Sequence, residues 1–505
     1  MSFSLQEEIK SKLLNNQDFV ARKIKTVSGE VLLFFLKSMV DKASVSKEVI
    51  EPILNHKESF VFDDLLTKII SSADAKEIKK EEIVDEILKN HIVLAFNDQF
   101  LTIDLEKVPH RTPTEPPTSP NIYGPREGFI EEIGTNISMI RRRLPTAHLK
   151  MENFNIGRET KTKVCMLYLK NVANKEVIKE IKNRLKQIDI DGILDTYYIA
   201  EFLKKRPYSL FEQTGFQEKP DIVVAKVLEG RVAILVDGSP IVLTLPYMVF
   251  EDLQSSNDYY TNYIYVGMIR IIRTLGILVS TIVPGLYLSI RLYSYTTLPL
   301  SYIIIISNST NNLPFTPVLE IIFILVLFQI WYEVSLRLPQ YLGLATSIVG
   351  ALVLGDTAVK AGLISPPGVI IVAVSIMAIY TIPSLASQLT VLRAVFVILG
   401  SCLGLLGIVG GLIYVINYIN SLNYYGTPFL APISPQVGPD LKDGFFKSPL
   451  TQITTRPASL NVKNKTRQSG GGKNEQWYNL CPSNWSYCRT VALYIKDVVF
   501  TIFII

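Results

Sequence analysis

The sequence predicts an α/β soluble N-terminal region of two subdomains followed by an α-helical polytopic membrane domain. Three observations lead to this fold class. Charged side chains crowd the first 273 and last 84 positions, whereas only seven lie in residues 274–421. Strand-like and helical patterns alternate before that stretch, as in layered α/β folds. Long apolar runs then follow, in a chain of 505 residues that is 48% hydrophobic with positive mean hydropathy.

Residues 1–110 are expected to form the first α/β subdomain. Residues 31–36 are a short continuous apolar run, which is typical of a buried strand, and residues 46–54 and 80–88 carry apolar residues at helical spacing. The turn-forming pair Asn97-Asp98 separates two strand-like runs and predicts a hairpin. The proline-rich residues 111–121 then predict an extended linker.

Residues 122–260 are expected to form the second α/β subdomain. Residues 163–169 are a strand candidate, and residues 174–185 follow with helical spacing. Two alternating runs flank Asp237-Gly238, a strong hairpin signal because both residues tolerate positive φ. No glycine run ending in Lys-Ser or Lys-Thr follows these strands, so a phosphate loop is not expected.

The membrane domain is predicted over residues 261–422, before a cytoplasmic tail at 423–505. Its expected apolar spans are residues 274–290, 315–338, 341–363, 366–386 and 392–419, with kinks or breaks at Pro284 and Pro383. Residues 298–307 are too short for a crossing and suit a re-entrant or interfacial segment. Four full crossings are the first choice and six the second.

Both ends of the chain are expected in the cytoplasm. Arg270 and Arg273 precede the first span, and the tail is basic. The N-terminus also lacks the apolar core and cleavage site of a secretory signal. Two cytoplasmic ends require an even number of crossings.

Charged and small residues inside the apolar region are the candidate functional positions. Residues 341–363 are rich in glycine, alanine, serine and threonine, and Asp356 and Lys360 lie four apart on one helical face. We therefore expect this helix to form the inner wall of an assembly. Glu333 and Arg337 share the same spacing, and two interpretations stay open: an amphipathic helix along the interface, or a helix facing a water-filled path.

Glycines in the last span have the spacing of close helix contacts. Gly400 and Gly404 are four apart, as are Gly407 and Gly411. Small residues let helices approach closely in lipid, so we expect packing rather than a role in conduction.

Catalytic and metal-binding patterns are not found in the sequence. Four dispersed histidines give no zincin or Ser-His-Asp pattern, and four scattered cysteines give no disulfide framework or zinc spacing. The expectation is therefore no enzyme, no cofactor and no metal. No basic stripe interleaved with aromatic residues argues for nucleic acid. Arg141, Arg142 and Arg143 favour organisation of the domain or a subunit contact over phosphate binding.

Several long motifs together resemble the A subunit of the GerA family of spore germinant receptors. The resemblance covers about residues 124–457, with a weaker echo in the first 110, and the tail after about 457 departs from the family. That departure suggests an altered reading frame or a lineage-specific extension. The motifs are GPREGFIEEIGTNISMIRRRL (124–144), RLKQIDIDGILD (184–195), KPDIVVAKVLEGRVAILVDGSP (219–240), SIVGALVLGDTAVKAGLISP (347–366) and YYGTPFLAPISP (424–435).

The resemblance implies a multi-pass protein of the spore inner membrane with a cytoplasmic N-terminal domain. It implies a homo-oligomeric, nutrient-gated ion channel surrounded by membrane lipid, which triggers spore germination with a transporter-like B subunit and a lipoprotein C subunit. Gly350, Val353, Thr357 and Lys360 are then the pore or gate candidates, with Asp356 neutralising Lys360 or setting ion preference.

Two other functions stay open at this point. The breaks at Pro284 and Pro383 support a secondary transporter of a small solute or ion, because transporter sites often use interrupted helices. Against it, no inverted repeat is recognisable. A membrane-bound enzyme is the least favoured, because no catalytic constellation is found.

Overall fold

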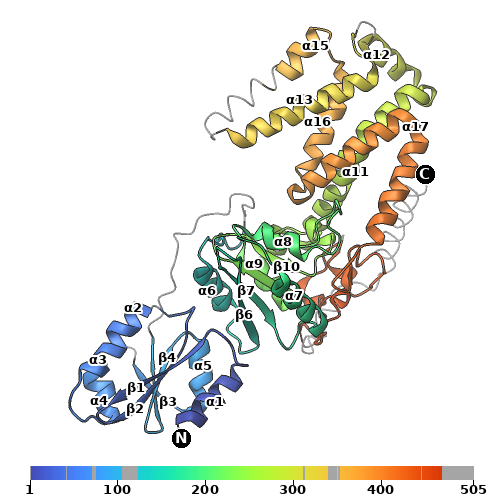
Figure 1. The fold of residues 1–505 in the computed structure, drawn as a ribbon. Coiled ribbons are helices and arrows are strands. Elements are labelled where there is room, and N and C mark those ends of the chain that lie inside the picture. Colours follow the sequence, from blue (N-terminus) through green and yellow to red (C-terminus); the bar gives the residue numbers. More distant parts are fainter. Residues whose placement is uncertain are drawn as a thin grey trace.

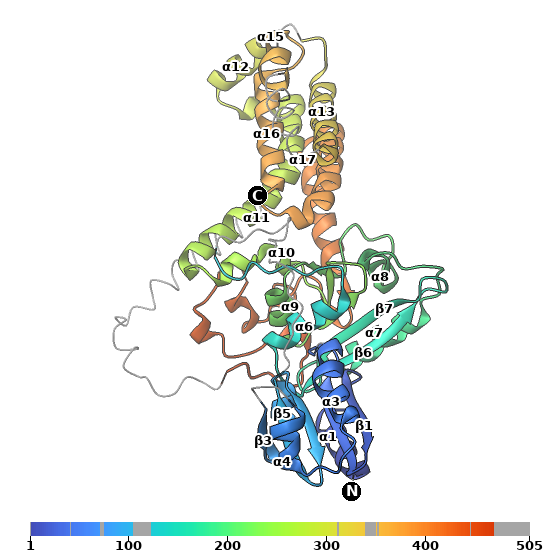
Figure 2. The ribbon, with the colours of Figure 1, turned by 90° about the vertical axis from the view of Figure 1, so that its left-hand side faces the viewer.

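The computed structural model describes residues 2–40, 42–70, 75–104, 123–310, 313–338, 350, 353–444 and 446–468. Figures 1 and 2 show two α/β units and a helical region following one another along the long axis of the molecule. This arrangement confirms the predicted fold class. The predicted linker at 111–121 lies outside the described residues.

The first subdomain is a five-stranded antiparallel sheet with helices packed against it. The strand order is β1-β2-β4-β5-β3. Asn97 and Asp98 both have positive φ and join β4 to β5, as the sequence predicts. The elements are α1 (Ser2–Lys12), β1 (Phe19–Thr26), β2 (Gly29–Leu36), α2 (Lys42–Ser44), η1 (Val45–Ile50), α3 (Glu51–Asn55), α4 (Phe62–Asp64), η2 (Leu65–Ile69), β3 (Lys76–Ile78), η3 (Lys80–Glu82), α5 (Ile83–Leu88), β4 (Ile92–Phe96) and β5 (Gln99–Ile103).

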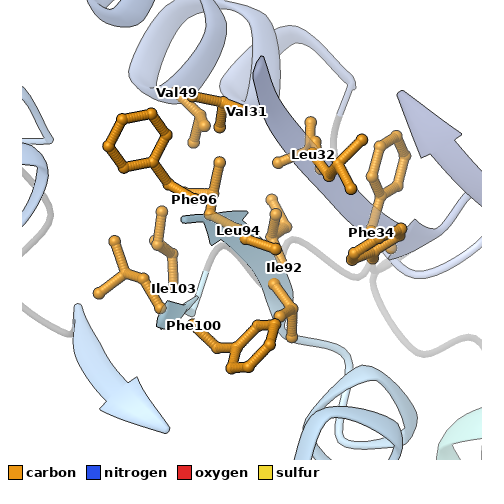
Figure 3. Close-up of a cluster of buried hydrophobic side chains, with 14 of the residues drawn as sticks. Val31, Leu32, Phe34, Val49, Ile92, Leu94, Phe96, Phe100 and Ile103 are labelled. Carbon is orange, nitrogen blue, oxygen red and sulfur yellow. The ribbon is translucent and has the colours of Figure 1, made fainter. Parts of the chain in front are cut away.

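Apolar side chains from the central strands and the helices close the core of this subdomain. Figure 3 shows Val31 of β2 beside Val49 of η1, with Phe96 of β4 nearby. These side chains are at most a few percent exposed, which explains the continuous apolar runs of β2 and β4.

The second subdomain is a three-layer α/β/α unit around another antiparallel sheet, with strand order β6-β7-β9-β10-β8. Asn174 caps α7 through its side chain, and Gly238 has positive φ in the β9–β10 hairpin, as predicted. The elements are α6 (Ile133–Arg143), β6 (Leu149–Ile156), β7 (Thr162–Leu169), α7 (Lys175–Gln187), α8 (Thr196–Leu203), β8 (Gly215–Gln217), α9 (Pro220–Leu228), β9 (Val232–Val236), β10 (Val242–Leu245), α10 (Phe250–Leu253) and η4 (Ser256–Tyr259).

Alternation along β7 explains the two covered faces of this sheet. Val164 and Met166 pack towards α7 and α8, whereas Cys165 and Leu167 pack towards α6 and α9. Successive side chains of a strand point to opposite faces, so a strand covered on both sides reads as one apolar run.

The arginine run at 141–143 forms contacts within the chain. Arg141 is 1% exposed and its Nε lies 3.6 Å from the Asp18 carboxylate of the first subdomain. Arg142 and Arg143 both donate to Glu127. These arginines therefore join the subdomains and organise the second one.

The helical region begins with α11 (Tyr263–Tyr293), which carries Pro284 inside it and leads directly out of the second subdomain. By length and composition, three described helical segments could cross a membrane: Tyr263–Tyr293, Pro317–Ser335 and Pro383–Asn420. The other elements are η5 (Tyr295–Thr297), α12 (Leu300–Thr310), α13 (Pro317–Arg337), η6 (Val353–Thr357), α15 (Ala358–Lys360), α16 (Pro366–Ile379), η7 (Pro383–Leu385) and α17 (Ala386–Asn420).

The last predicted span, residues 392–419, is not one straight helix. Gly404 has φ 62° and ψ −144° inside α17, and the helix folds back there. Leu399 consequently faces both Gly407 and Gly411, and Phe396 faces Gly411, as the contacts of a Cβ at these glycines show. Only a residue without a Cβ adopts such angles readily, so the reversal depends on Gly404. The apolar run around Gly404 is uniform in sequence and therefore gives no other sign of the reversal. The span at 366–386 is also shorter than predicted, since α16 ends at Ile379.

Residues 423–468 differ from the separate tail that the sequence predicts. Tyr424 and Phe429 are buried in the core on the α7–α8 side of the second sheet, and Leu460 and Val462 in the core on its other side. The short β11 (Asn423–Tyr424) and β12 (Thr427–Pro428) lie in this segment, with η8 (Asp440–Lys442), η9 (Leu450–Gln452) and η10 (Ala458–Leu460). The chain thus returns from the helices to the soluble unit it left. Residues 469–505 lie outside the described residues.

Candidate functional site

A buried ion cluster joins the soluble unit to the start of α11. We call it the base cluster: Asp258 of η4, Arg270 and Arg273 of α11, and Asp443 and Lys447 of the returning segment. Arg270 Nε lies 3.1 Å from Asp258 Oδ2, and its Nη1 lies 3.0 Å from Asp443 Oδ1. Arg273 Nη1 lies 2.8 Å from the same Asp258 oxygen. One arginine thus connects two segments that are far apart in sequence.

Backbone carbonyls add further hydrogen bonds to the base cluster. Arg270 Nη1 donates to the carbonyl oxygens of Asp443 and Gly444 at 2.9 and 2.6 Å, and Lys447 Nζ donates to that of Asp258 at 2.6 Å. The Arg270 side chain is 0% exposed. Buried charges must be paired and hydrogen-bonded to be tolerated, so this geometry fixes α11 to the soluble unit.

A second charged group lies beside the base cluster in the soluble unit. Arg231 bridges Glu229 and Glu251, and Lys226 also pairs with Glu251. Burial alone would raise the pKa of Glu251, but the two cations outweigh it and lower that pKa. Between the two groups lies a small pocket of about 60 Å³ lined by Arg231, Glu251, Asp443 and residues of the returning segment.

A third group, the interior cluster, joins three helices at the end of the helical region remote from the soluble unit. It consists of Arg291 of α11, Glu320 of α13 and Ser365, which caps α16. Arg291 Nη1 lies 3.0 Å from Glu320 Oε2, and the Ser365 backbone N–H donates to Glu320 Oε1 at 2.7 Å. Glu320 is 0% exposed. A Cβ at Gly368 would lie 2.7 Å from Glu320 Oε1, so the carboxylate needs that glycine.

The pairs predicted from spacing lie on the outside of the chain. Lys360 Nζ lies 2.7 Å from Asp356 Oδ2, with side chains 74% and 57% exposed. Arg337 Nε lies 3.1 Å from Glu333 Oε1, and these side chains are 78% and 52% exposed. Such pairs contribute little within one chain, but their exposed faces are free for lipid, water or another subunit.

The predicted gate stretch at 341–363 lies partly outside the described residues, which omit 339–349 and 351–352. A Cβ at Gly350 would lie 2.8 Å from the indole nitrogen of Trp331 in α13, so this glycine permits a close contact. Val353 and Thr357 delimit η6. Their assignment to a gate stays a prediction.

Two of the four predicted packing glycines lie against backbone atoms, and the other two lie against side chains. A Cβ at Gly400 would approach the carbonyl oxygen of Gly285 in α11 to 2.3 Å, and one at Gly407 the carbonyl oxygen of Leu399 to 2.4 Å. At Gly411 the nearest atoms are side-chain carbons of Leu399 and Phe396, whereas Gly404 forms the reversal beside Tyr293.

The model of the "Bacillus/Clostridium GerA spore germination protein" family matches residues 7–459. That range covers nearly all of both α/β units, the helices and most of the returning segment. The chain belongs to the GerA family of spore germination proteins. The resemblance carried by the motifs is thereby confirmed, and it extends into the first subdomain.

Curated members of the GerA family align along most of the chain. "Spore germination protein KA" of Bacillus subtilis is 32% identical over 91% of this chain and 87% of its own length. "Spore germination protein XA" of Bacillus anthracis is 30% identical over 88% of this chain and 92% of its own length. Among solved structures, the N-terminal domain of the A subunit of the Bacillus megaterium spore germinant receptor GerK3 is 26% identical, with a TM-score of 0.35, over 48% of this chain and 92% of that domain.

The base and interior clusters escaped the sequence analysis because their members are distant in sequence. Arg270 and Asp443 are 173 positions apart, and Arg291 and Glu320 are 29 apart. One signal was available. Of the seven charged residues in the apolar region, four form pairs at helical spacing. The other three, Arg291, Glu320 and Arg393, have no partner at that spacing, which indicates that they interact with more distant residues or with a ligand.

Proposed function

We propose that this GerA-family chain is the A subunit of a nutrient-sensing germinant receptor in the spore inner membrane. It would form the homo-oligomeric ion channel of that receptor, with its α/β units in the cytoplasm, and would act with a transporter-like B subunit and a lipoprotein C subunit. Membership of the GerA family supports the receptor assignment. The channel is what the resemblance to germinant-receptor A subunits implies, and the polar and small residues around η6 are compatible with it.

The base cluster is the observation that carries a coupling role. Arg270 holds the first helix to η4 and to the segment that returns from the last helix. A displacement of the soluble unit would therefore move both ends of the helical region together. Nutrient binding changes such an equilibrium only if the ligand binds one state more tightly than the other.

The gate would lie in the stretch around η6. Gly350 permits a close helix approach, and Asp356 and Lys360 expose a charged pair that a neighbouring subunit could complete around an axis. Val353, at the first position of η6, would then supply apolar bulk to a constriction.

Ion release from spores carrying Val353→Ala tests this gate. We expect release, or germination, before any nutrient is added, because the variant removes side-chain bulk. Val359→Ala, in the adjoining α15, is the matched control, since Val359 packs within the chain on the core around Leu288 and Ile321. Normal dormancy and a normal nutrient response in Val353→Ala spores would remove Val353 from the gate. Saturable counterflow of a solute by the purified protein would instead favour a transporter.

A further inference from the structure

A pocket in the helical region contains a buried arginine that has no counterion among the described residues. The pocket measures about 310 Å³ and lies between α13, α16 and α17. Arg393 of α17 lines it and is only 5% exposed. Among the residues that the structure describes, no atom hydrogen-bonds to Arg393 Nη1. The other lining residues are Phe328, Gln329, Tyr332, Ile376, Ile379, Tyr380, Ala386, Ser387 and Thr390.

The described lining of this pocket contains no carboxylate. Its polar groups are the guanidinium, one amide and four hydroxyls. The Ser387 and Thr390 hydroxyls already donate to Gln388 Oε1 and to the Ala386 carbonyl oxygen, and the other groups can donate hydrogen bonds. Residues 339–352, most of which lie outside the described part, contain no aspartate or glutamate either. A buried cation without a partner is costly, so the site is built for an anionic group from outside this part of the chain.

The position of Arg393 places the pocket at the level of lipid headgroups. Leu385 and Leu389 pack against Phe250 and Leu253 of the soluble α10, so the start of α17 touches the soluble unit. Arg393 lies one helical turn further, about 6 Å deeper at 1.5 Å per residue. Tyr332 and Tyr380, whose ring centroids are 6.1 Å apart, lie beside it, and tyrosine is enriched at this depth of a membrane.

The shape of the pocket favours a lipid over a single side chain of a neighbouring protein. A volume of about 310 Å³ is at the lower end of the range of small-molecule sites and is more than one carboxylate needs. Phe328, Ile376 and Ile379 add apolar surface to the lining beside these polar groups. This combination matches a phosphate joined to acyl chains.

We propose that this pocket binds the phosphate group of an anionic phospholipid, with Arg393 as its principal contact. Arginine suits this role because its planar fork can donate two hydrogen bonds to one phosphate. The exposed basic residues of the returning segment do not supply such a site, because they lie in the soluble unit.

Lipid retention by the full chain tests the proposal. The protein would be purified in detergent, mixed with phosphatidylglycerol or phosphatidylcholine, and examined by native mass spectrometry and thermal unfolding. We expect wild type to retain phosphatidylglycerol and to unfold at a higher temperature with it. Arg393→Gln should weaken that retention by about tenfold or more, since a charge-assisted contact is lost. The matched control is Arg337→Gln, an exposed arginine on α13 outside the pocket, which should retain the lipid as wild type does.

Folding failure is separated from ligand loss by measuring the variants without lipid. Arg393→Gln should unfold no earlier than wild type in lipid-free detergent, because it removes an unpaired buried charge. If that variant does not fold, the lipid retention of Arg393→Lys is measured instead. This variant should retain phosphatidylglycerol less well than wild type.

Three results would overturn the proposal. Equal retention of phosphatidylglycerol by wild type and both Arg393 variants would remove the site. An equal rise in unfolding temperature with inorganic phosphate alone would assign the pocket to a free anion. A smaller oligomer for Arg393→Gln, with unchanged lipid retention, would assign Arg393 to a carboxylate of a neighbouring subunit.

Discussion

Arg270→Leu removes the cation at the centre of the base cluster while preserving an apolar side chain on α11. The change breaks ion pairs of 3.1 and 3.0 Å to Asp258 and Asp443, and two hydrogen bonds to backbone carbonyls. Removing one partner of a buried pair costs about 3–5 kcal/mol. Asp258 keeps Arg273 and Asp443 keeps the Tyr259 hydroxyl, so we expect the lower end, about 3 kcal/mol.

Thermal unfolding of the full-length protein in detergent measures this effect. A loss of about 3 kcal/mol corresponds to a fall in the unfolding midpoint of roughly 6–12 °C for a unit of 150–250 residues. The matched control is Arg158→Leu, because the Arg158–Asp189 pair has comparable distances but side chains that are 62% and 69% exposed. The control should barely change the midpoint.

A double variant checks that the loss arises from the cluster. Arg270→Leu combined with Asp443→Asn should destabilise less than the sum of the two single changes, because each already breaks the same pair. Equal midpoint shifts for Arg270→Leu and Arg158→Leu, or strict additivity in the double variant, would refute the reasoning.

Three further predictions concern other parts of the structure. Glu320→Gln should cost about 1–3 kcal/mol of stability, because Arg291 loses its counterion, and thermal unfolding should show a lower midpoint. Glu333→Gln on the same helix should leave the midpoint unchanged, because the Glu333–Arg337 pair is exposed. Burial raises the pKa of Asp252 from 3.8 to about 6, so ionising this carboxyl should lower the free energy of unfolding by up to about 3 kcal/mol. This loss of stability should begin as the pH rises above about 4 and should be complete above pH 6. Asp252→Asn should abolish the fall in stability with rising pH. Gly400→Ala should disturb helix packing, because its Cβ would meet a backbone oxygen at 2.3 Å, whereas Gly410→Ala, in open space, should be tolerated in thermal unfolding.

Local patterns in the sequence predicted the soluble architecture well. The Asn97-Asp98 and Asp237-Gly238 hairpins follow from the backbone preferences of the turn residues themselves. The strand at 163–169 follows from its continuous apolar run, and the helix at 174–185 from apolar residues at helical spacing. These features depend on neighbours in sequence.

Long-range contacts explain what the sequence could not predict. A single sequence shows pairs at helical spacing, so Glu333–Arg337 and Asp356–Lys360 stood out although both are exposed. The pair Arg291–Glu320 depends on how two helices pack, and Arg270–Asp443 on a segment that returns from the last helix. The reversal of α17 likewise depends on one glycine within a uniform apolar run.

The most direct test of the receptor function compares nutrient-triggered ion release from spores that lack this chain with release from spores that carry it. Over a panel of single nutrients, we predict that spores without the chain lose the response to at least one nutrient, and that the wild-type chain restores it. Restoration by Arg270→Leu should be weaker at matched abundance of the protein. Identical responses to every nutrient with and without the chain would contradict the account.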